Sequence, residues 1–405
     1  MDQYRGMFDQ AVEQLGPGRD KVAALRESLA RRCLDGQGNG TAPMRKRGGF
    51  WGVAAAAAAC LALAAWAGAG LLHIGRDTPD ACTAELPKLP LSVEVTEPAG
   101  MGFEGYLAFD SAELVDANPW TKDTKLSALP VYRNLAPLDG AGVPKADPDP
   151  ARTRDTLLKT AALLGLNPDD VEIDGNPEPG LGFTAQAEGV EITAWEDRTV
   201  TIHFNPAVPL PEGYKFDYSA GYEDIAAAAE YLKVQYKDLL AMENPQVDIS
   251  GGDYTIYADQ MYSLAFFDEG DSLTDTLLNY NFHRVAFFGN DEGKLFIIRL
   301  FSTDLSEKVG DYPIITPKAA EKLLLEGRYI TSVPYELPGK QYVKQVELLY
   351  LTGGREEYFM PYYRFLVELP EGARENGLNI YGAYYVPAVE ESCLTGLPVW
   401  DGGFN

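Results

Sequence analysis

The sequence predicts an α+β fold, with an N-terminal transmembrane helix followed by an extracytoplasmic set of units that each combine a helix with an antiparallel sheet. Two observations predict it. Residues 50–74 are 25 residues without a formal charge. After residue 150, one amphipathic helical pattern followed by strand-like runs occurs three times. Helices that alternate with groups of antiparallel strands are typical of sheets carrying a helix on one face.

Composition indicates a folded protein with a strongly acidic main part. The 405 residues are 46% hydrophobic and 23% charged, which is enough apolar material for two or three domains. The net charge of −26 is uneven, because residues 1–49 are net +3 and residues 75–405 are net −29. A surface this acidic repels phosphate backbones, so we expect no nucleic-acid partner.

Residues 50–74 have the length of a membrane span. As a helix they would reach about 37 Å, against a hydrocarbon core of about 30 Å. Fourteen of the 25 residues are Ala or Gly, so the span would be only weakly hydrophobic. A buried core helix and a late-cleaved signal are the alternatives. Cleavable signals lie nearer the N-terminus, so an uncleaved signal anchor is favoured.

The flanks of this segment predict its orientation. Arg45, Lys46 and Arg47 precede it, whereas Arg76 is followed by Asp77 and Asp80. The positive-inside rule then places the N-terminus in the cytoplasm and the C-terminal domain outside a cell membrane crossed once. A ridge of small residues suggests homodimerisation through this helix, although an Ala-rich composition alone also produces such ridges. The ridge consists of Gly52, Ala56, Cys60, Ala64 and Gly68.

Breaks in composition divide the chain into six segments. We expect a short cytoplasmic helical segment at 1–49, the transmembrane helix at 50–74 and a proline-containing stalk at 75–100. A strand-rich entry region and linker at 101–150 follows, then α+β units at 151–310 and a C-terminal α+β unit at 311–405.

The first two repeats of the pattern begin with well-marked helices. Thr153 is the expected N-cap of the first helix and Gly165 its stop, with strands near 190–194 and 199–204. The second helix is expected at 222–243, before Pro245. Strands near 253–267, 282–288 and 294–301 follow it, and the sequence GNDEG predicts a tight turn between the last two.

The third repeat starts at Thr316, which is the expected N-cap before Pro317, with Gly327 as the stop. Strands are expected near 342–351, 358–369 and 380–387. The run YPIITPKAAEKLLLEG…VKQVELLYL…YFMPYYRFLVEL…YGAYYVPAV resembles the PepSY-like modules found outside the membrane in bacterial signalling regulators, including accessory proteins that restrain sensor kinases. This resemblance extends over residues 150–390.

The layout of residues 1–75 is similar to that of small anti-sigma factors and clostridial-type single-span membrane proteins. Together the two resemblances imply a regulatory protein with a protein partner. The zinc-binding His/Cys cluster of the better-known anti-sigma type has no counterpart, because residues 1–49 contain Cys33 and no His.

The sequence carries no strong catalytic or metal signature. HExxH, CxxC, GxSxG and P-loop motifs are absent, so we expect no catalytic residues, no metal and no cofactor. Of the three histidines, His73 ends the predicted span. We expect His203 on the solvated face of a strand and His283 to be structural. Acidic loops around Asp169 and Asp268 lack the spacing of the twelve-residue calcium loop.

Two extracytoplasmic cysteines raise the question of a disulfide. Cys82 and Cys393 would close a loop worth about 4–5 kcal/mol in the chain-entropy model. Two free thiols are the alternative, since spacing alone does not bring the residues together.

Tyrosines gather near the C-terminus. Ten of the 23 lie between residues 329 and 385. A groove for a ligand or partner is one interpretation, but strand positions on a helix-packed sheet give the same composition without a ligand, and core packing is favoured. The groove candidates are Tyr362, Tyr363, Tyr381, Tyr384 and Tyr385.

The favoured functional hypothesis is a non-enzymatic, membrane-anchored regulatory or sensory protein that couples envelope-side binding to the cytoplasmic segment. An envelope protein that binds glycan or peptide in the tyrosine-rich groove is the alternative. A hydrolase without recognisable motifs is a third, less favoured hypothesis.

Overall fold

The computed structural model describes residues 86–91, 105–139, 145, 149–167, 171–174, 182–187, 189–255, 258–370, 377–400 and 402. The chain divides into two compact units, Met1–Gly75 and Arg76–Asn405, and every described residue belongs to the second. The predicted cytoplasmic segment, the predicted membrane span with its ridge of small residues, and Cys82 therefore lie outside the described residues. No helix in the described ranges is long and apolar enough to cross a membrane.

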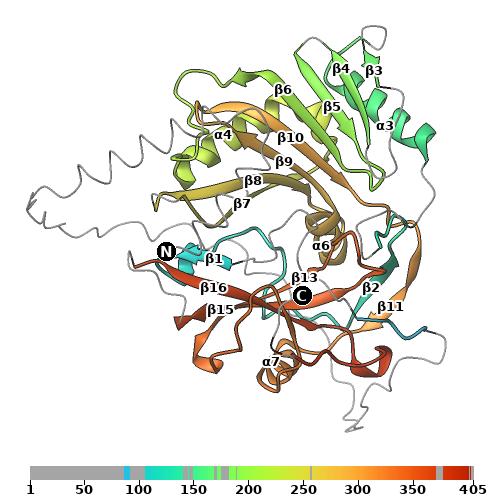
Figure 1. The fold of residues 1–405 in the computed structure, drawn as a ribbon, viewed down its shortest axis with the longest axis vertical. Helices are drawn as coiled ribbons and strands as arrows, with labels where there is room; N and C mark the ends of the chain where they lie inside the picture. Colours follow the sequence, from blue (N-terminus) through green and yellow to red (C-terminus); the bar gives the residue numbers. More distant parts are fainter. Residues whose placement is uncertain are drawn as a thin grey trace, which may run out of the picture. The chain divides into compact units, whose positions relative to one another are not determined.

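The larger of the two main sheets in the described part has eight antiparallel strands (Figure 1). Their order across the sheet is β3-β4-β5-β6-β10-β9-β8-β7. The strands are β3 (Glu172–Ile173), β4 (Phe183–Ala187), β5 (Val190–Ala194), β6 (Val200–Pro209), β7 (Pro245–Tyr254), β8 (Gln260–Asp268), β9 (His283–Gly289) and β10 (Lys294–Ser302).

Three helices cover one face of this sheet. They are α3 (Pro150–Leu163), α4 (Tyr222–Gln235) and the short α5 (Lys237–Leu240). Leu157 of α3 and Ile225 of α4 share a core with inward-facing strand residues such as Ile192 and Ile202. Because side chains alternate along a strand, the neighbouring residues Thr193, Thr201 and His203 point to the opposite face.

The second main sheet has the order β1-β16-β15-β13, with β12 also paired to β16. Apolar residues cover both of its faces. Tyr363 and Tyr384 belong to the cluster that includes helices α6 (Leu273–Phe282) and α7 (Pro317–Leu325). Tyr362 and Tyr385 belong to the cluster on the other face. The strands are β1 (Gly105–Ala108), β12 (Ile330–Thr331), β13 (Val343–Tyr350), β15 (Pro361–Leu369) and β16 (Asn379–Pro387).

A three-stranded sheet of order β11-β2-β14 completes the strands of the described part. Its strands are β2 (Ala128–Arg133), β11 (Lys308–Pro313) and β14 (Tyr358–Phe359). Single turns of 3-10 helix are η1 (Ser111–Glu113), η3 (Lys340–Tyr342) and η5 (Glu391–Cys393). The segment 86–91 joins the unit through Leu89, whose backbone N–H donates to the carbonyl of Cys393 over 2.9 Å.

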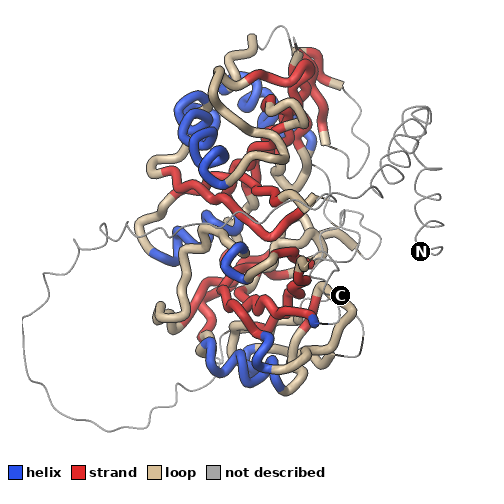
Figure 2. The backbone as a smooth tube through the Cα atoms, turned by 90° about the vertical axis from the view of Figure 1, so that its left-hand side faces the viewer, coloured by secondary structure: helices blue, strands red, loops and turns tan. Residues whose placement is uncertain are grey.

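The predicted α+β fold class is wrong. The described part is β-rich, and Figure 2 shows strands taking up more of its backbone than helices. Separate helix-and-sheet units do not form, because β6 of the first repeat pairs with β10 of the second and merges the two into one sheet. The first described strand, β1, pairs with the last, β16. Such long-range pairings leave no trace in local periodicity.

Several individual elements were predicted correctly, and others were displaced. Thr316 caps α7 with Pro317 at its first position, as expected. The first helix, however, begins at Pro150 with Asp149 as its cap, because the Asp149 carboxylate accepts from the N–H of Arg152. The second helix breaks at Tyr236, which separates α4 from α5. Helix α6 was missed, although Ser272 caps it through the N–H of Asp275.

Candidate functional site

The face of the eight-stranded sheet opposite α3 and α4 is polar along β4, β5 and β6. At β8 and β9, helix α6 packs on the same face, and Phe267 there is 2% exposed. Strand register aligns the residues of this face in rows. Thr193 of β5 lies opposite Thr201 of β6, which lies opposite Arg299 of β10. Arg299 in turn lies opposite Ala286 of β9. Two residues away along the strands, Glu191 of β5 lies opposite His203 of β6 on the same face. His203 therefore lies on the face for which the sequence predicts it. This face carries the two hollows that follow.

The larger hollow is a cleft of about 680 Å³. Its floor is the open face of β6, β10, β9 and β8, where Thr201, Ala286 and Ala265 leave room beside larger neighbours. The turn between β5 and β6 and the chain at Thr303–Asp304 form one part of the wall. Segments 134–138 and 352–354, together with Phe359, form another. Segments far apart in the sequence thus enclose it.

Four arginines line this cleft, namely Arg152, Arg198, Arg284 and Arg299. Two of them form ion pairs, Arg198 with Asp304 and Arg284 with Asp248. The side chain of Asp248 is fully buried, so Arg284 is needed to balance its charge. These two arginines are held in place by carboxylates of the fold.

The other two arginines have no ion pair within the described ranges. Arg152 donates from Nη2 to the carbonyl oxygen of Glu196 over 3.1 Å. Arg299 lies over the ring of Phe288, with 5.8 Å between its guanidinium carbon and the ring centroid. Phe288 itself is 38% exposed. The charge of Arg152 acts on the nearby carboxylates of Glu196 and Asp304, so Arg299 is the cation of the cleft without a carboxylate partner among the described residues. A cation of this kind beside aromatic surface suits an anionic ligand with an apolar part.

Arg198 shows two signs of a constrained site. Its φ of +70° places a non-glycine residue in the left-handed region, which costs free energy. Its Nε is also buried without a hydrogen-bond partner. The N–H of Arg198 closes a turn onto the carbonyl of Trp195 over 3.0 Å. The fold thus holds a buried donor without a hydrogen-bond partner in a residue that lines the cleft.

The charges of the arginines act on the pKa values of two carboxylates that line the cleft, Asp304 and Glu196. Burial raises the pKa of Asp304, but hydrogen bonds from Ser306 and the charges of Arg198 and Arg152 outweigh burial and lower the pKa overall. For Glu196 burial prevails, and the pKa is raised although Arg152 lowers it. Asp304 consequently stays ionised and keeps Arg198 in position.

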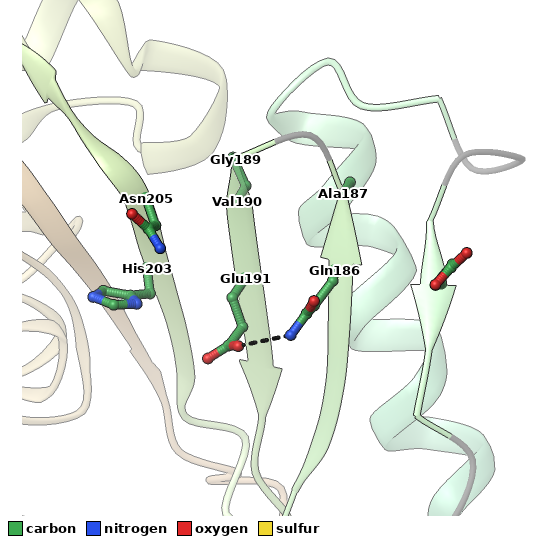
Figure 3. A pocket seen from close by; sticks show the side chains of 8 residues that line it. Gln186, Ala187, Gly189, Val190, Glu191, His203 and Asn205 are labelled. Carbon is green, nitrogen blue, oxygen red and sulfur yellow. Dashed lines mark hydrogen bonds between the residues drawn. The ribbon is translucent and has the colours of Figure 1, made fainter. Parts of the chain in front are cut away.

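The smaller hollow, of about 440 Å³, lies at the β3–β6 end of the same face (Figure 3). Its lining includes Glu172, Gln186, Glu191, His203 and Asn205. Gln186 donates from Nε2 to Glu191 Oε2 over 3.1 Å. The His203 ring packs edge-on against Phe296, with 4.4 Å between ring centroids. This hollow is acidic, in contrast to the cleft.

The five tyrosines predicted to line a groove do not do so. Tyr362, Tyr363, Tyr381, Tyr384 and Tyr385 are each at most 3% exposed. Both faces of their sheet are covered, so adjacent tyrosines that point to opposite faces are all buried. Core packing, the favoured interpretation of these tyrosines, explains their positions.

The remaining sequence predictions concern the cysteines, His283 and the absence of a metal site. Cys393 is buried in η5, and Cys82 lies outside the described residues, so the disulfide stays a prediction. His283 is structural as expected, because its ring nitrogens contact Asn279 Oδ1 and the carbonyl of Thr303, each over 3.1 Å. Across the described ranges no three His, Cys, Asp or Glu residues are grouped to hold a metal ion.

Sequence reasoning missed the cleft arginines. Arg299 is the one charged residue within the apolar run LFIIRLF, and its same-face neighbours Ile297 and Phe301 are apolar, so alternation gives no signal for it. Arg198 lies in a turn between two predicted strands. A count of arginines against the acidic background would have drawn attention to both, but only the β6–β10 pairing brings them together.

Comparison with known proteins gives no family for the chain. No protein-family model matches it, and a search of curated proteins finds no match.

Proposed function

We propose that the protein is a non-enzymatic regulatory or sensory protein, anchored in a membrane by residues 50–74, whose arginine cleft binds an anionic ligand with an apolar part. One observation carries the ligand-binding part. Four arginines line a single cleft together with three carboxylates, and one of the arginines, Arg299, has no ion pair among the described residues and lies beside an exposed aromatic ring. The membrane anchor and the cytoplasmic segment rest on the sequence pattern alone.

The cleft supports binding better than it supports chemistry. Its cations and aromatic rings provide orientation and affinity for a carboxylate that carries a ring or an aliphatic group. Arg299 lacks an ion pair among the described residues and lies beside the exposed ring of Phe288, so the two parts of such a ligand would meet adjacent protein groups. We therefore assign Arg299 to the anionic group.

The test uses N-acetyl-L-phenylalanine and its amide, which differ in one charge. Titrations of the full-length protein in detergent, followed by tryptophan fluorescence, should show the acid binding roughly tenfold more tightly than the amide, as expected for a charge-assisted hydrogen bond. Trp195 lines the cleft and provides the signal.

Arg299→Gln should abolish the preference for the acid, whereas Arg328→Gln, which removes a charge away from the cleft, should retain it. Equal binding of acid and amide by the unmodified protein would contradict the proposal. The regulatory part has a separate test, because deleting residues 1–45 should remove an effect on gene expression while leaving ligand binding unchanged.

A further inference from the structure

The acidic hollow and the arginine cleft lie on one continuous face of the eight-stranded sheet. Glu191 and Trp195 are both on the uncovered side of the β5 chain, the first in the hollow and the second in the cleft. His203 of β6 lines the hollow, and Thr199, the residue just before β6, lines the cleft. Four residues along a strand correspond to about 13 Å. The two hollows are thus close enough for one small ligand.

Threonine hydroxyls lie between the two hollows. Thr193 and Thr201 lie side by side there in the strand register. Thr184 Oγ1 lies 3.2 Å from Thr193 Oγ1, which continues the hydroxyl surface onto β4. Hydroxyl groups donate and accept hydrogen bonds, so they suit the amide groups of an extended chain.

The two ends carry opposite charge. Glu172 and Glu191 line the hollow. Arg299 and Arg198 line the cleft, where Arg299 has no ion pair among the described residues and Arg198 Nε is buried without a partner. By strand register Glu191 and Arg299 are two strands and two residues apart, which places their Cα atoms about 12 Å apart.

We propose that one extended zwitterionic ligand, a short peptide with free termini, spans both hollows. Its ammonium group lies at Glu191 and its carboxylate at Arg299. This inference rests on the proposed function, because it uses the same cleft for the anionic group. An extended chain advances about 3.4 Å per residue, so a tetrapeptide matches the separation of the two charges.

The experiment blocks each charge of the peptide in turn. The probe is Ala-Ala-Ala-Phe, compared with its N-acetyl form, its C-terminal amide and the doubly blocked peptide. Calorimetric titration of the full-length protein should show that acetylation weakens binding roughly threefold, as for a partly exposed ion pair. Amidation should weaken it roughly tenfold. The dipeptide Ala-Phe, too short to span, should respond to amidation only.

Variants assign each effect to its end. In Glu191→Gln, acetylation should no longer weaken binding, while amidation still does. In Arg299→Gln the pattern should reverse. Glu212→Gln, an exposed carboxylate that lines neither hollow, is the control and should behave as the unmodified protein does.

Two results distinguish the failure of this inference from that of the proposed function. If amidation weakens binding and acetylation does not, the glutamate hollow is only a solvated surface; the peptide proposal is then wrong and the arginine cleft stands. If neither blocking group matters, both are wrong.

Discussion

The two main sheets of the described unit differ in how much of their surface is covered. The sheet containing β15 and β16 is covered on both faces, so Tyr362 and Tyr363 are adjacent in sequence and both no more than 2% exposed. The eight-stranded sheet is covered by α3, α4 and α5 on one face, while its other face is covered by α6 at β8 and β9 and carries the two hollows elsewhere. The fully covered sheet holds the unit together, whereas the half-covered sheet offers a surface for ligands.

The arginines of the two sheets show the same difference. Arg364 of β15 is 16% exposed and contacts both Glu347 and Asp116, and its Nη1 donates to the hydroxyl of Tyr106 over 3.0 Å. Arg299 of β10 has no carboxylate partner within the described ranges. A buried cation saturated by its neighbours indicates a structural role, and an unsaturated cation at a cleft indicates binding.

The largest expected effect comes from the saturated cation. Arg364→Met leaves Glu347 and Asp116 beside each other without their cation, and should lower the free energy of unfolding by about 3 kcal/mol. The control Arg133→Met removes a cation whose partner Glu307 is 59% exposed, and should change it by less than about 1 kcal/mol. Denaturant titration of the full-length protein measures both. If the two variants lowered the free energy of unfolding by similar amounts, Arg364 would have no special structural role.

Arg198, unlike Arg364, has a backbone conformation that lowers the stability of the fold. Arg198→Gly removes the left-handed strain and the ion pair with Asp304 together, while Arg198→Ala removes only the ion pair. The free energy of unfolding of the Gly variant should therefore be about 1 kcal/mol higher than that of the Ala variant. Both should bind N-acetyl-L-phenylalanine more weakly, by roughly tenfold. Unchanged binding in both would exclude Arg198 from the site.

The tyrosines of the covered sheet should affect stability without affecting binding. Tyr363 donates its hydroxyl hydrogen to the carbonyl of Ile315 over 2.8 Å, and Tyr384 donates to that of Tyr335 over 2.8 Å. Replacing either by Phe should cost about 1 kcal/mol, because a buried carbonyl loses its donor. Tyr218→Phe, at a residue 52% exposed, is the neutral control. A change in ligand affinity in either buried variant would support the hypothesis that these tyrosines line a binding groove.

The smallest expected effect is a pH dependence at Asp116. Burial raises the pKa of this carboxyl and the charge of Glu347 raises it further, while Arg364 lowers it. A raised pKa in the folded state gives stability that is present below the unfolded pKa and is lost as pH rises through the folded value. Asp116→Asn cannot bind that proton. Its free energy of unfolding, relative to the unmodified protein, should therefore increase as the pH rises above the pKa of an ordinary aspartate. A difference that is constant with pH would contradict this sign.

Local signals in the sequence were sufficient for several elements and failed for others in ways that have physical reasons. The Thr316–Pro317 start of α7 and the GNDEG turn, where Gly293 has a φ of +71°, were predicted because capping and turn chemistry act between near neighbours. Helix α6 was missed because its short sequence LTDTLLNYNF, half apolar and half polar, runs directly into β9. Apolar periodicity does not separate a short buried helix from a strand.

The fold class and the site depended on pairings that no local pattern contains. Arg299 and Thr201 are 98 positions apart and become neighbours only through the β6–β10 ladder. The tyrosines looked like a groove because the sequence shows which residues alternate along a strand, but not that a second layer covers each face. Long-range topology thus decided both the correct and the incorrect site predictions.

The attachment at Leu89 has a mechanical consequence. Its N–H donates to the carbonyl of Cys393, and its own carbonyl accepts from the N–H of Thr395, both over 2.9 Å. The side chain of Leu89 is fully buried, and the Tyr312 hydroxyl donates to the carbonyl of Pro87 over 2.8 Å. Tension arriving along the chain from the N-terminal side meets these bonds before it reaches either main sheet. Pulling on the chain from this side should therefore break the hydrogen bonds of segment 86–91 before it distorts the cleft.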